Sequence, residues 1–174
     1  HRRLPKEHPL MKLLLPHFRF TIEINDSALH SLIVPGGVVA TVIGPTIEST
    51  GQLLAKASAA WRWDEHNPDH LFNLRGVDSD ALSDFPFRDD TLLLWNAIKN
   101  FVGNYVETYY PNDQSVADDY EVQGWINELV SPLYAGFKGL NGLKPTGNAG
   151  APFRIDSRDY LVELVSHIIR SEEH

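Results

Sequence analysis

The apolar stretch that runs up to Pro111 constrains the fold more than any other part of this sequence. Its apolar side chains recur with a period of about 3.6 residues, which predicts an amphipathic helix over residues 91–110. Asp89 or Asp90 is suited to begin this helix, because short acidic side chains accept hydrogen bonds from the first backbone N–H groups. Trp95 and its leucine neighbours extend the apolar surface to nearly all sides, as in helices buried in a larger core. The predicted stripe, all of it expected in the core, consists of Leu94, Ile98, Phe101, Val102, Tyr105 and Tyr109.

Further helices with wide apolar faces indicate an all-α fold around this long helix. Two short helices are predicted over residues 26–34 and 51–61. Two longer helices are predicted to begin at Asp118 or Asp119 and at Ser157, residue types that favour helix starts. Their predicted apolar faces are Val122, Trp125, Ile126, Leu129 and Leu133 in the first, and Leu161, Leu164, Val165 and Ile168 in the second.

Three stretches between these helices are predicted to be irregular. Residues 38–43 are rich in β-branched side chains, but Gly44 and Pro45 follow at once, so an extended or irregular segment is expected. Residues 61–72 contain an Asn-Pro pair and are predicted to form a loop. Residues 138–152 are rich in glycine and contain two prolines, which again predicts a loop.

Composition excludes several classes of protein. A chain of 174 residues with 43% hydrophobic and 22% charged residues is expected to fold as one domain. The net charge of −8 argues against a nucleic-acid partner and against binding to an anionic membrane surface. The absence of cysteine excludes disulfides and thiolate metal sites. No apolar run reaches the roughly 18 residues of a transmembrane helix, and no signal peptide is evident, so a cytoplasmic protein is expected.

Histidines are the candidate metal ligands, because imidazole is a common ligand of transition metals. His66 and His70 are four residues apart, as two ligands on one helix face would be, but they lie in the proline-containing loop. A solvated loop is therefore favoured over a metal site there. Neighbouring aspartates such as Asp89 and Asp90 do not share a helix face, and no nucleotide-binding or serine-hydrolase motif is present.

Two runs of residues resemble a known family. The run from His8 to Ile33, HPLMKLLLPHFRFTIEINDSALHSLI, resembles a core motif of lipoxygenases, the iron dioxygenases of polyunsaturated fatty acids. The run from Phe85 to Tyr110 resembles the family's helix YRDDGxxxWxAIxxFVxxYVxxYY. The first run departs from the family at Leu29, where an arginine is usual. Its matching positions are His8, Pro9, Lys12, Leu13, Leu14, Pro16, His17, Thr21, Ile24, Asn25, Ala28, Leu32 and Ile33.

The resemblance implies a reaction and a metal. Lipoxygenases abstract a hydrogen from a bis-allylic methylene with an Fe(III)-hydroxide and then add O₂ to give a hydroperoxide. The family's first two iron-binding histidines lie on a helix that precedes the motif at His8, and nothing in this chain matches them. His174 lies two residues short of the third ligand, a shift that rotates a helical side chain by about 200°. We therefore assign no catalytic residue and no metal ligand within the chain, and expect it to bind no iron.

Four residues match substrate-pocket positions of the family. Ala28 stands where lipoxygenases of S stereochemistry have alanine and many of R stereochemistry have glycine. Leu32, one helical turn later, matches a leucine that clamps the pentadiene of the fatty acid. Val42 and Ile43 match residues that set the depth of the pocket. The alternative is that these residues are simply packing residues of amphipathic helices. His8 and His17 do not match ligand positions, and we expect them to hydrogen-bond backbone beside their neighbouring prolines.

Two functional hypotheses follow from these observations. The first is that residues 1–174 are a partial lipoxygenase catalytic domain, with a polyunsaturated fatty acid and O₂ as its substrates in the intact enzyme. The second is a metal-free helical protein that binds apolar ligands or a partner chain. Because the set of iron ligands is incomplete, the isolated chain is expected to be inactive. Exposed apolar faces further predict self-association or binding of a complementary chain.

Overall fold

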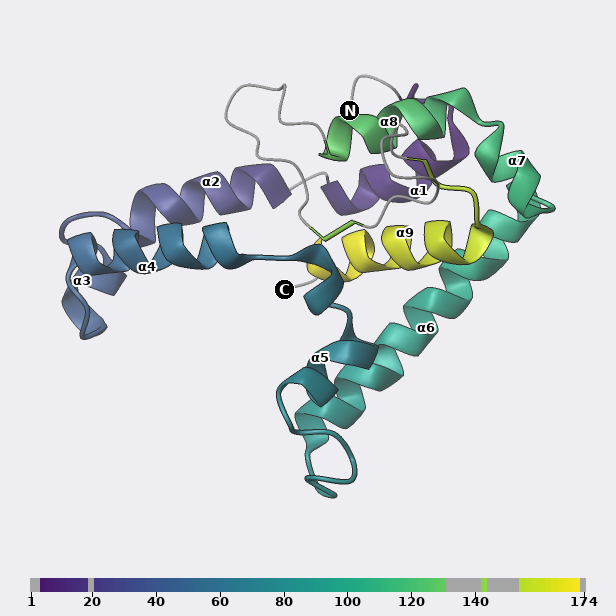
Figure 1. Cartoon of the computed structure of the whole chain (residues 1–174). Coiled ribbons are helices and arrows are strands. Elements are labelled where there is room, and N and C mark those ends of the chain that lie inside the picture. Colours follow the sequence, from purple (N-terminus) through teal and green to yellow (C-terminus); the bar gives the residue numbers. More distant parts are fainter. Residues whose placement is uncertain (1–3, 19–20, 131–141, 144–153, 173–174) are drawn as a thin grey trace. The chain divides into compact units, whose positions relative to one another are not determined.

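The computed structural model describes residues 4–18, 21–130, 142–143 and 154–172, and its regular elements are helices (Figure 1). This confirms the predicted all-α fold. The chain divides into two compact units. Unit 1 comprises residues 1–14 and 62–174, and unit 2 comprises residues 15–61. Whether both units belong to one catalytic domain stays a prediction.

The longest helix of unit 1 is α6, Pro86–Tyr109. It begins about one turn earlier than the predicted start at Asp89 or Asp90, so that prediction was wrong. Pro86 is the first helical residue, a position where proline is favoured because its fixed φ suits a helix and no N–H is needed. Asp89 lies instead in the first turn, where its negative charge is favourable near the positive end of the helix dipole. The helix ends before Pro111, as predicted.

The core of unit 1 forms where α9, Arg158–Glu172, packs against α6. Trp95 and Val102 on α6 are fully buried, and so is Leu161 on α9. The apolar face predicted for α9 is confirmed in full, because Leu164, Val165 and Ile168 are also buried. Ser157 begins α9 as predicted, with its hydroxyl oxygen accepting the N–H of Tyr160 at 3.3 Å.

The predicted stripe of α6 was partly wrong. Ile98 and Val102 are buried, but Leu94, Phe101 and Tyr109 are 44%, 60% and 48% exposed. The buried face is centred on Trp95, Val102 and Val106, and Phe101 lies about 100° away from Val102 around the helix axis. Tyr105 is half-buried, and its hydroxyl donates to the carbonyl of Pro9 at 3.0 Å.

Two shorter helical elements replace the loop predicted over residues 61–72. A 3-10 turn, η1, spans Trp63–Glu65, and α5 spans Pro68–Leu74. Asn67 caps α5 by accepting the N–H of Asp69 at 2.9 Å, so the Asn-Pro pair starts a helix instead of marking a loop. The carboxylate of Asp69 accepts the indole N–H of Trp95 at 2.8 Å and thereby joins α5 to α6.

The remaining helices of unit 1 complete its core. Helix α7 spans Asp113–Ala117 and α8 spans Tyr120–Val130, so the predicted start at Asp118 or Asp119 is confirmed. Helix α1 spans Pro9–Phe18, and its first half contributes buried leucines to unit 1. Most of the loop predicted over residues 138–152 lies outside the described residues, as does Leu133. The buried side chains of α1 and α8 are Leu10, Met11, Leu13, Leu14, Val122, Trp125 and Ile126, and Leu129 is half-buried.

Unit 2 consists of α2, Thr21–Leu32, α3, Val38–Val42, and α4, Ile47–Ala60. The short helix α3 corrects the irregular segment predicted at residues 38–43. The β-branched side chains there form one helical turn after Gly37, which serves as the N-cap and accepts the N–H of Thr41 at 3.1 Å. Helix α2 begins before the predicted position, and α4 begins after Thr46 instead of at Thr50. Thr46 caps α4 by accepting the N–H of Ser49 at 3.2 Å.

The apolar side chains of unit 2 lie at its surface. Among the described side chains of this unit none is buried, whereas unit 1 contains the whole described core. Packing of an amphipathic face supplies most of the stability of a short helix in a protein. The exposed apolar side chains of unit 2 are therefore typical of helices that gain their stability by packing against another surface. In the described part of the chain no helix has the length and hydropathy needed to cross a membrane.

A pair of leucine substitutions tests this division between core and surface. Leu164 on α9 is 1% exposed, whereas Leu93 on α6 is 72% exposed. We expect Leu164→Ala to lower the free energy of unfolding by about 2–5 kcal/mol, because it leaves a cavity in the core. The matched Leu93→Ala variant is expected to change it by less than about 0.5 kcal/mol. Urea unfolding followed by circular dichroism measures both values, and similar values for the two variants would contradict the assigned core.

Candidate functional site

The predicted pocket residues all lie in unit 2. Ala28 and Leu32 are on α2, one helical turn apart, and therefore share a face of that helix. Ala28 is half-buried and Leu32 is 42% exposed. Val42 is the last residue of α3 and Ile43 is its C-cap, with 77% and 52% of their surfaces exposed. Helices α2 and α3 are in contact within unit 2. The pocket assignment itself stays a prediction.

Exposed apolar side chains accompany these residues on α2 and α3, although α2 also carries the exposed carboxylates of Glu23 and Asp26. Ile24 and Leu29 on α2 are 62% and 53% exposed, and Val38 at the start of α3 is 51% exposed. Leu29, which stands where lipoxygenases usually have an arginine, thus adds to this apolar surface instead of presenting a charge.

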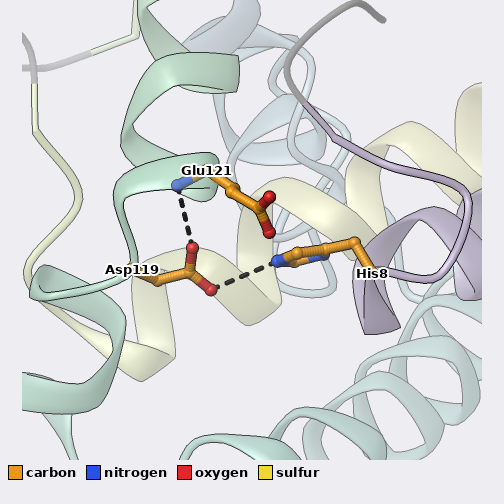
Figure 2. Close-up of side chains that lie close together, drawn as sticks. All are labelled: His8, Asp119 and Glu121. Atoms are coloured by element: carbon orange, nitrogen blue, oxygen red, sulfur yellow. Dashed lines mark hydrogen bonds and ion pairs between the residues drawn. The ribbon is translucent and has the colours of Figure 1, made fainter.

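A second cluster lies in unit 1, where three helix ends meet at His8, Tyr110 and Asp119. Figure 2 shows His8 and Asp119 of this cluster together with Glu121. The backbone N–H of Leu10 donates to Nδ1 of His8 at 3.1 Å. Nε2 of His8 lies 3.2 Å from Oδ2 of Asp119. Because Nδ1 is an acceptor, the ring proton of neutral His8 is on Nε2, from which it is donated to the carboxylate. The structural role expected for His8 is confirmed. His17 is half-buried, and its expected role stays a prediction.

Asp119 is the centre of this cluster. Its Oδ2 also accepts the hydroxyl of Tyr110 at 2.7 Å, and its Oδ1 accepts the N–H groups of Glu121 and Val122, both at 3.0 Å, at the start of α8. Burial alone would raise the pKa of Asp119, but the hydrogen bonds from His8, Val122 and Tyr110 outweigh it and lower the pKa to about 2. Burial, and then the hydrogen bond to Asp119, raises the pKa of Tyr110.

The same cluster is the strongest geometric candidate for a metal site. Ligand atoms of His8, Asp119 and Glu121 lie within 4.8 Å of one another, the one such group of three among the described residues. The donor set does not fit a metal, however. The Nδ1 lone pair of His8 is occupied by the N–H of Leu10, and Nε2 carries the proton that Asp119 accepts. Binding a metal at Nε2 would break both hydrogen bonds, so we assign this cluster to structural support and not to iron.

A cavity of about 660 Å³ lies within unit 1, beside η1, α5 and α9. His70 on α5 is exposed and lines the cavity, whereas His66 caps η1 and lies with Nδ1 2.7 Å from the carbonyl of Arg62. The predicted solvated loop around these two histidines was therefore wrong, because both lie in or beside helical turns. The described residues that line the cavity also include Trp63, Asp64, Glu65, Asn67, Gly142, Tyr160, Glu163, Leu164 and His167.

His167 in this cavity was not identified from the sequence. It is only 4% exposed, and its ring lies 4.0 Å from that of Trp63, tilted by 33°. Burial, and then the positive charges of Arg170 and His66, lower the pKa of His167 to about 4, so the ring is neutral at neutral pH. The sequence feature that could have identified His167 is its spacing of four residues from Glu163, which places an acidic side chain and an imidazole on one face of the last helix.

Similarity to known proteins now decides the family. A family model described as lipoxygenase matches residues 1–140. The polyunsaturated fatty acid lipoxygenase ALOX15B of Homo sapiens is 34% identical over 168 residues, which are 97% of this chain and 23% of that protein. Lipoxygenase 2, chloroplastic, of Arabidopsis thaliana is 36% identical over 138 residues, which are 74% of this chain and 15% of that protein. The crystal structure of coral 8R-lipoxygenase has a TM-score of 0.79 at 28% identity and covers 96% of this chain and 24% of its own.

This chain belongs to the lipoxygenase family. It spans less than a quarter of the length of the human relative, so activity of a whole lipoxygenase is not established for it. The family uses non-haem iron and acts on polyunsaturated fatty acids. A second solved structure, of a calcium-dependent 11R-lipoxygenase, matches with a TM-score of 0.73 at 33% identity and supports the same helical arrangement of the family.

The His8 cluster of this lipoxygenase chain gives a test of its electrostatics. The pKa of Asp119 is about 2, below its ordinary 3.8, so its carboxylate stabilises the fold above about pH 4 and loses this effect as the pH falls through 2. We expect Asp119→Asn to destabilise the chain at pH 7 by on the order of 2 kcal/mol. The difference from the unmodified chain should shrink between pH 4 and about pH 2.

Urea unfolding at several pH values measures this difference. Asp90→Asn is the matched control, because Asp90 is an exposed carboxylate on α6 and should change stability little at any pH. A difference between Asp119→Asn and the unmodified chain that is the same at pH 7 and at about pH 2 would contradict the assigned role of the carboxylate.

Proposed function

We propose that this chain forms a substrate-pocket wall of a lipoxygenase that adds O₂ to a polyunsaturated fatty acid with S stereochemistry. The observation that carries the proposal is the position of Ala28 and Leu32 on one face of α2, within the residues that match the family model. Both side chains are apolar, and α2 and α3 also carry exposed apolar side chains such as Ile24 and Val38. An acyl chain is the ligand class that such a surface accepts best.

Ala28 is proposed to control where oxygen reaches the substrate. A single methyl group fills a space beside one carbon of the pentadiene, and removing it opens room for a small molecule such as O₂. Leu32 is proposed to hold the pentadiene in place from one helical turn further on. Val42 and Ile43, at the end of α3, are proposed to limit the depth of the pocket.

Iron enters this proposal only through the whole enzyme. The described residues gather one group of three potential ligands, and the histidine of that group has no free lone pair. We therefore assign no reaction step through iron to the residues of this chain. Their proposed contribution is to bind the acyl chain, to orient it and to govern the access of oxygen.

A second function is supported by the surface of unit 2. Its described side chains include no buried residue, and large apolar side chains such as Leu53 and Leu54 on α4 are 58% and 47% exposed. As an isolated polypeptide the chain is proposed to be a metal-free helical protein that self-associates or binds a complementary chain. Exposed apolar side chains of this kind favour association in water.

Substitution of Ala28 tests the first function. When this segment is placed in an intact parent lipoxygenase, Ala28→Gly should shift part of the product towards R stereochemistry and to a different carbon, because oxygen gains access beside the pentadiene. Chiral-phase chromatography of the hydroperoxides measures this shift. Leu32→Ala should instead lower kcat/KM, since a displacement of about 1 Å can reduce a rate by two orders of magnitude.

The packing alternative predicts a different outcome for these variants. If Ala28 and Leu32 only pack within α2 and its neighbours, both substitutions lower stability and leave the chirality of the product unchanged. An active, folded Ala28→Gly variant that still gives only S product would therefore reject the pocket assignment. Thermal unfolding of the same preparations separates a loss of stability from a change in positioning.

The isolated chain tests the second function. We expect no stoichiometric iron and no hydroperoxide from linoleate, because the described donors do not form a fitting iron site. We also expect a particle larger than the 19.6 kDa monomer in sedimentation at low concentration, together with binding of a hydrophobic dye. Active, iron-containing protein would refute the first expectation, and a compact monomer that binds no dye would refute the second.

A further inference from the structure

Aromatic side chains are exposed in unit 1 where the chain passes from α5 into α6 (Figure 1). Phe87, in the first turn of α6, is 63% exposed. Its ring centre lies 6.0 Å from that of the half-buried Phe85 and 6.3 Å from that of the buried Phe72. Phe72 thus supports the ring of Phe87 from the interior, while most of that ring remains open to solvent. We call Phe85 and Phe87 the aromatic patch.

Arg88 fixes the connection that leads into this patch. Its side chain is buried, donates to the carbonyls of Val77, at 3.4 Å, and of Leu82, and pairs with the carboxylate of Asp89 at 2.7 Å. The N–H of Val77 in turn donates to the carbonyl of Phe72 on α5 at 3.0 Å. The connection is therefore held against both helices, so a ligand that binds the aromatic patch has little ordering to do.

Carboxylates outnumber cations around the aromatic patch. Residues 75–90 contain five aspartates and two arginines, a net charge of −3. Arg75 is the exposed cation of this stretch. Asp84 directly precedes the first ring of the patch, and Asp90 lies one helical turn after Phe87 on the same face of α6. Within the described part of the chain, neither of these two carboxylates forms an ion pair or a side-chain hydrogen bond.

We propose that the aromatic patch binds an arginine-rich segment of a partner protein. The planar guanidinium group of arginine stacks on aromatic rings and pairs with carboxylates through two parallel hydrogen bonds. Phe87 offers the exposed ring, and Asp84 and Asp90 offer the carboxylates beside it. A lysine would satisfy the carboxylates but would gain less from the rings, because its ammonium group cannot stack.

The charge of the chain argues against other occupants of the patch. A second copy of this chain has a net charge of −8 and would bring the same acidic stretch to the interface. An anionic ligand would be repelled in the same way. A segment rich in arginine instead places cations where the carboxylates are, and this complementarity increases the rate of association.

This surface is separate from the residues on which the proposed function depends. The proposed pocket residues and the exposed leucines of α4 lie in unit 2, whereas the aromatic patch lies in unit 1. The patch also needs no metal ion. Failure of the experiments on Ala28 and Leu32 would therefore leave the patch in place, and failure of the patch would leave the pocket assignment in place.

A pair of peptides of equal charge tests the proposal on the full chain at pH 7. Fluorescence anisotropy of a labelled peptide of nine arginines measures its Kd at about 0.15 M ionic strength. A peptide of nine lysines supplies the same charge without guanidinium groups, and should bind at least about threefold more weakly. Phe87→Ser should weaken binding of the arginine peptide at least about threefold and remove most of the preference over lysine. Asp84→Asn combined with Asp90→Asn should weaken binding of both peptides.

Matched variants control for loss of a ring and for loss of charge. Phe101→Ser removes another exposed ring of α6, about 21 Å further along the helix, and should leave the Kd unchanged. Glu23→Gln combined with Glu48→Gln removes two exposed carboxylates from unit 2 and should weaken binding less than the pair at Asp84 and Asp90. Circular dichroism checks that each variant is folded, and if Phe87→Ser is not, the two carboxylate pairs decide.

Three results would overturn the proposal. The first is equal binding of the arginine and lysine peptides, or no binding of either, since the rings then contribute nothing. The second is a folded Phe87→Ser variant that binds as the unmodified chain does, or control variants that weaken binding as much as those at the patch. The third is a smaller particle for Phe87→Ser than for the unmodified chain in sedimentation, which would identify the patch as a contact between copies.

Discussion

The packing of α9 against α6 is the interaction on which the rest of unit 1 depends. The buried side chains of the two helices meet around Trp95, whose indole N–H is satisfied by Asp69 of α5. Burial of this large aromatic ring with its single polar atom paired is favourable, and it fixes α5 beside the same face. The cavity between α5 and α9 therefore exists because α6 holds both helices in position.

Much of the helical content could be predicted from periodicity alone. The faces of α8 and α9 were predicted correctly at Val122, Trp125 and Leu161, because both helices have one apolar side that can only be buried. Phe101 was assigned wrongly because α6 is apolar on several sides, and periodicity does not say which side a neighbouring helix covers. Local capping explains the other errors, since Thr46 and Pro86 begin helices earlier than Thr50 and Asp89.

Some candidate site residues could likewise be named from the sequence, whereas others were revealed only by the structure. Ala28, Leu32, Val42 and Ile43 were named because a family motif surrounds them, and their geometry on α2 and α3 is compatible with that assignment without testing it. The hydrogen bond from His8 to Asp119 joins residues 111 positions apart, a separation that no local pattern reveals. His167 lies within an apolar stripe, where a histidine is readily taken for a core residue.

The location of the proposed pocket residues in unit 2 has a consequence for how such a protein changes over evolution. Ala28, Leu32, Val42 and Ile43 are separate from the buried core of unit 1, which contains the large fully buried side chains of the described chain. Substitutions at these four positions do not open cavities in that core, so they escape the main route by which mutations destabilise proteins. The proposed pocket assignment therefore implies that product specificity can diversify in this segment while the helices of unit 1 continue to fold.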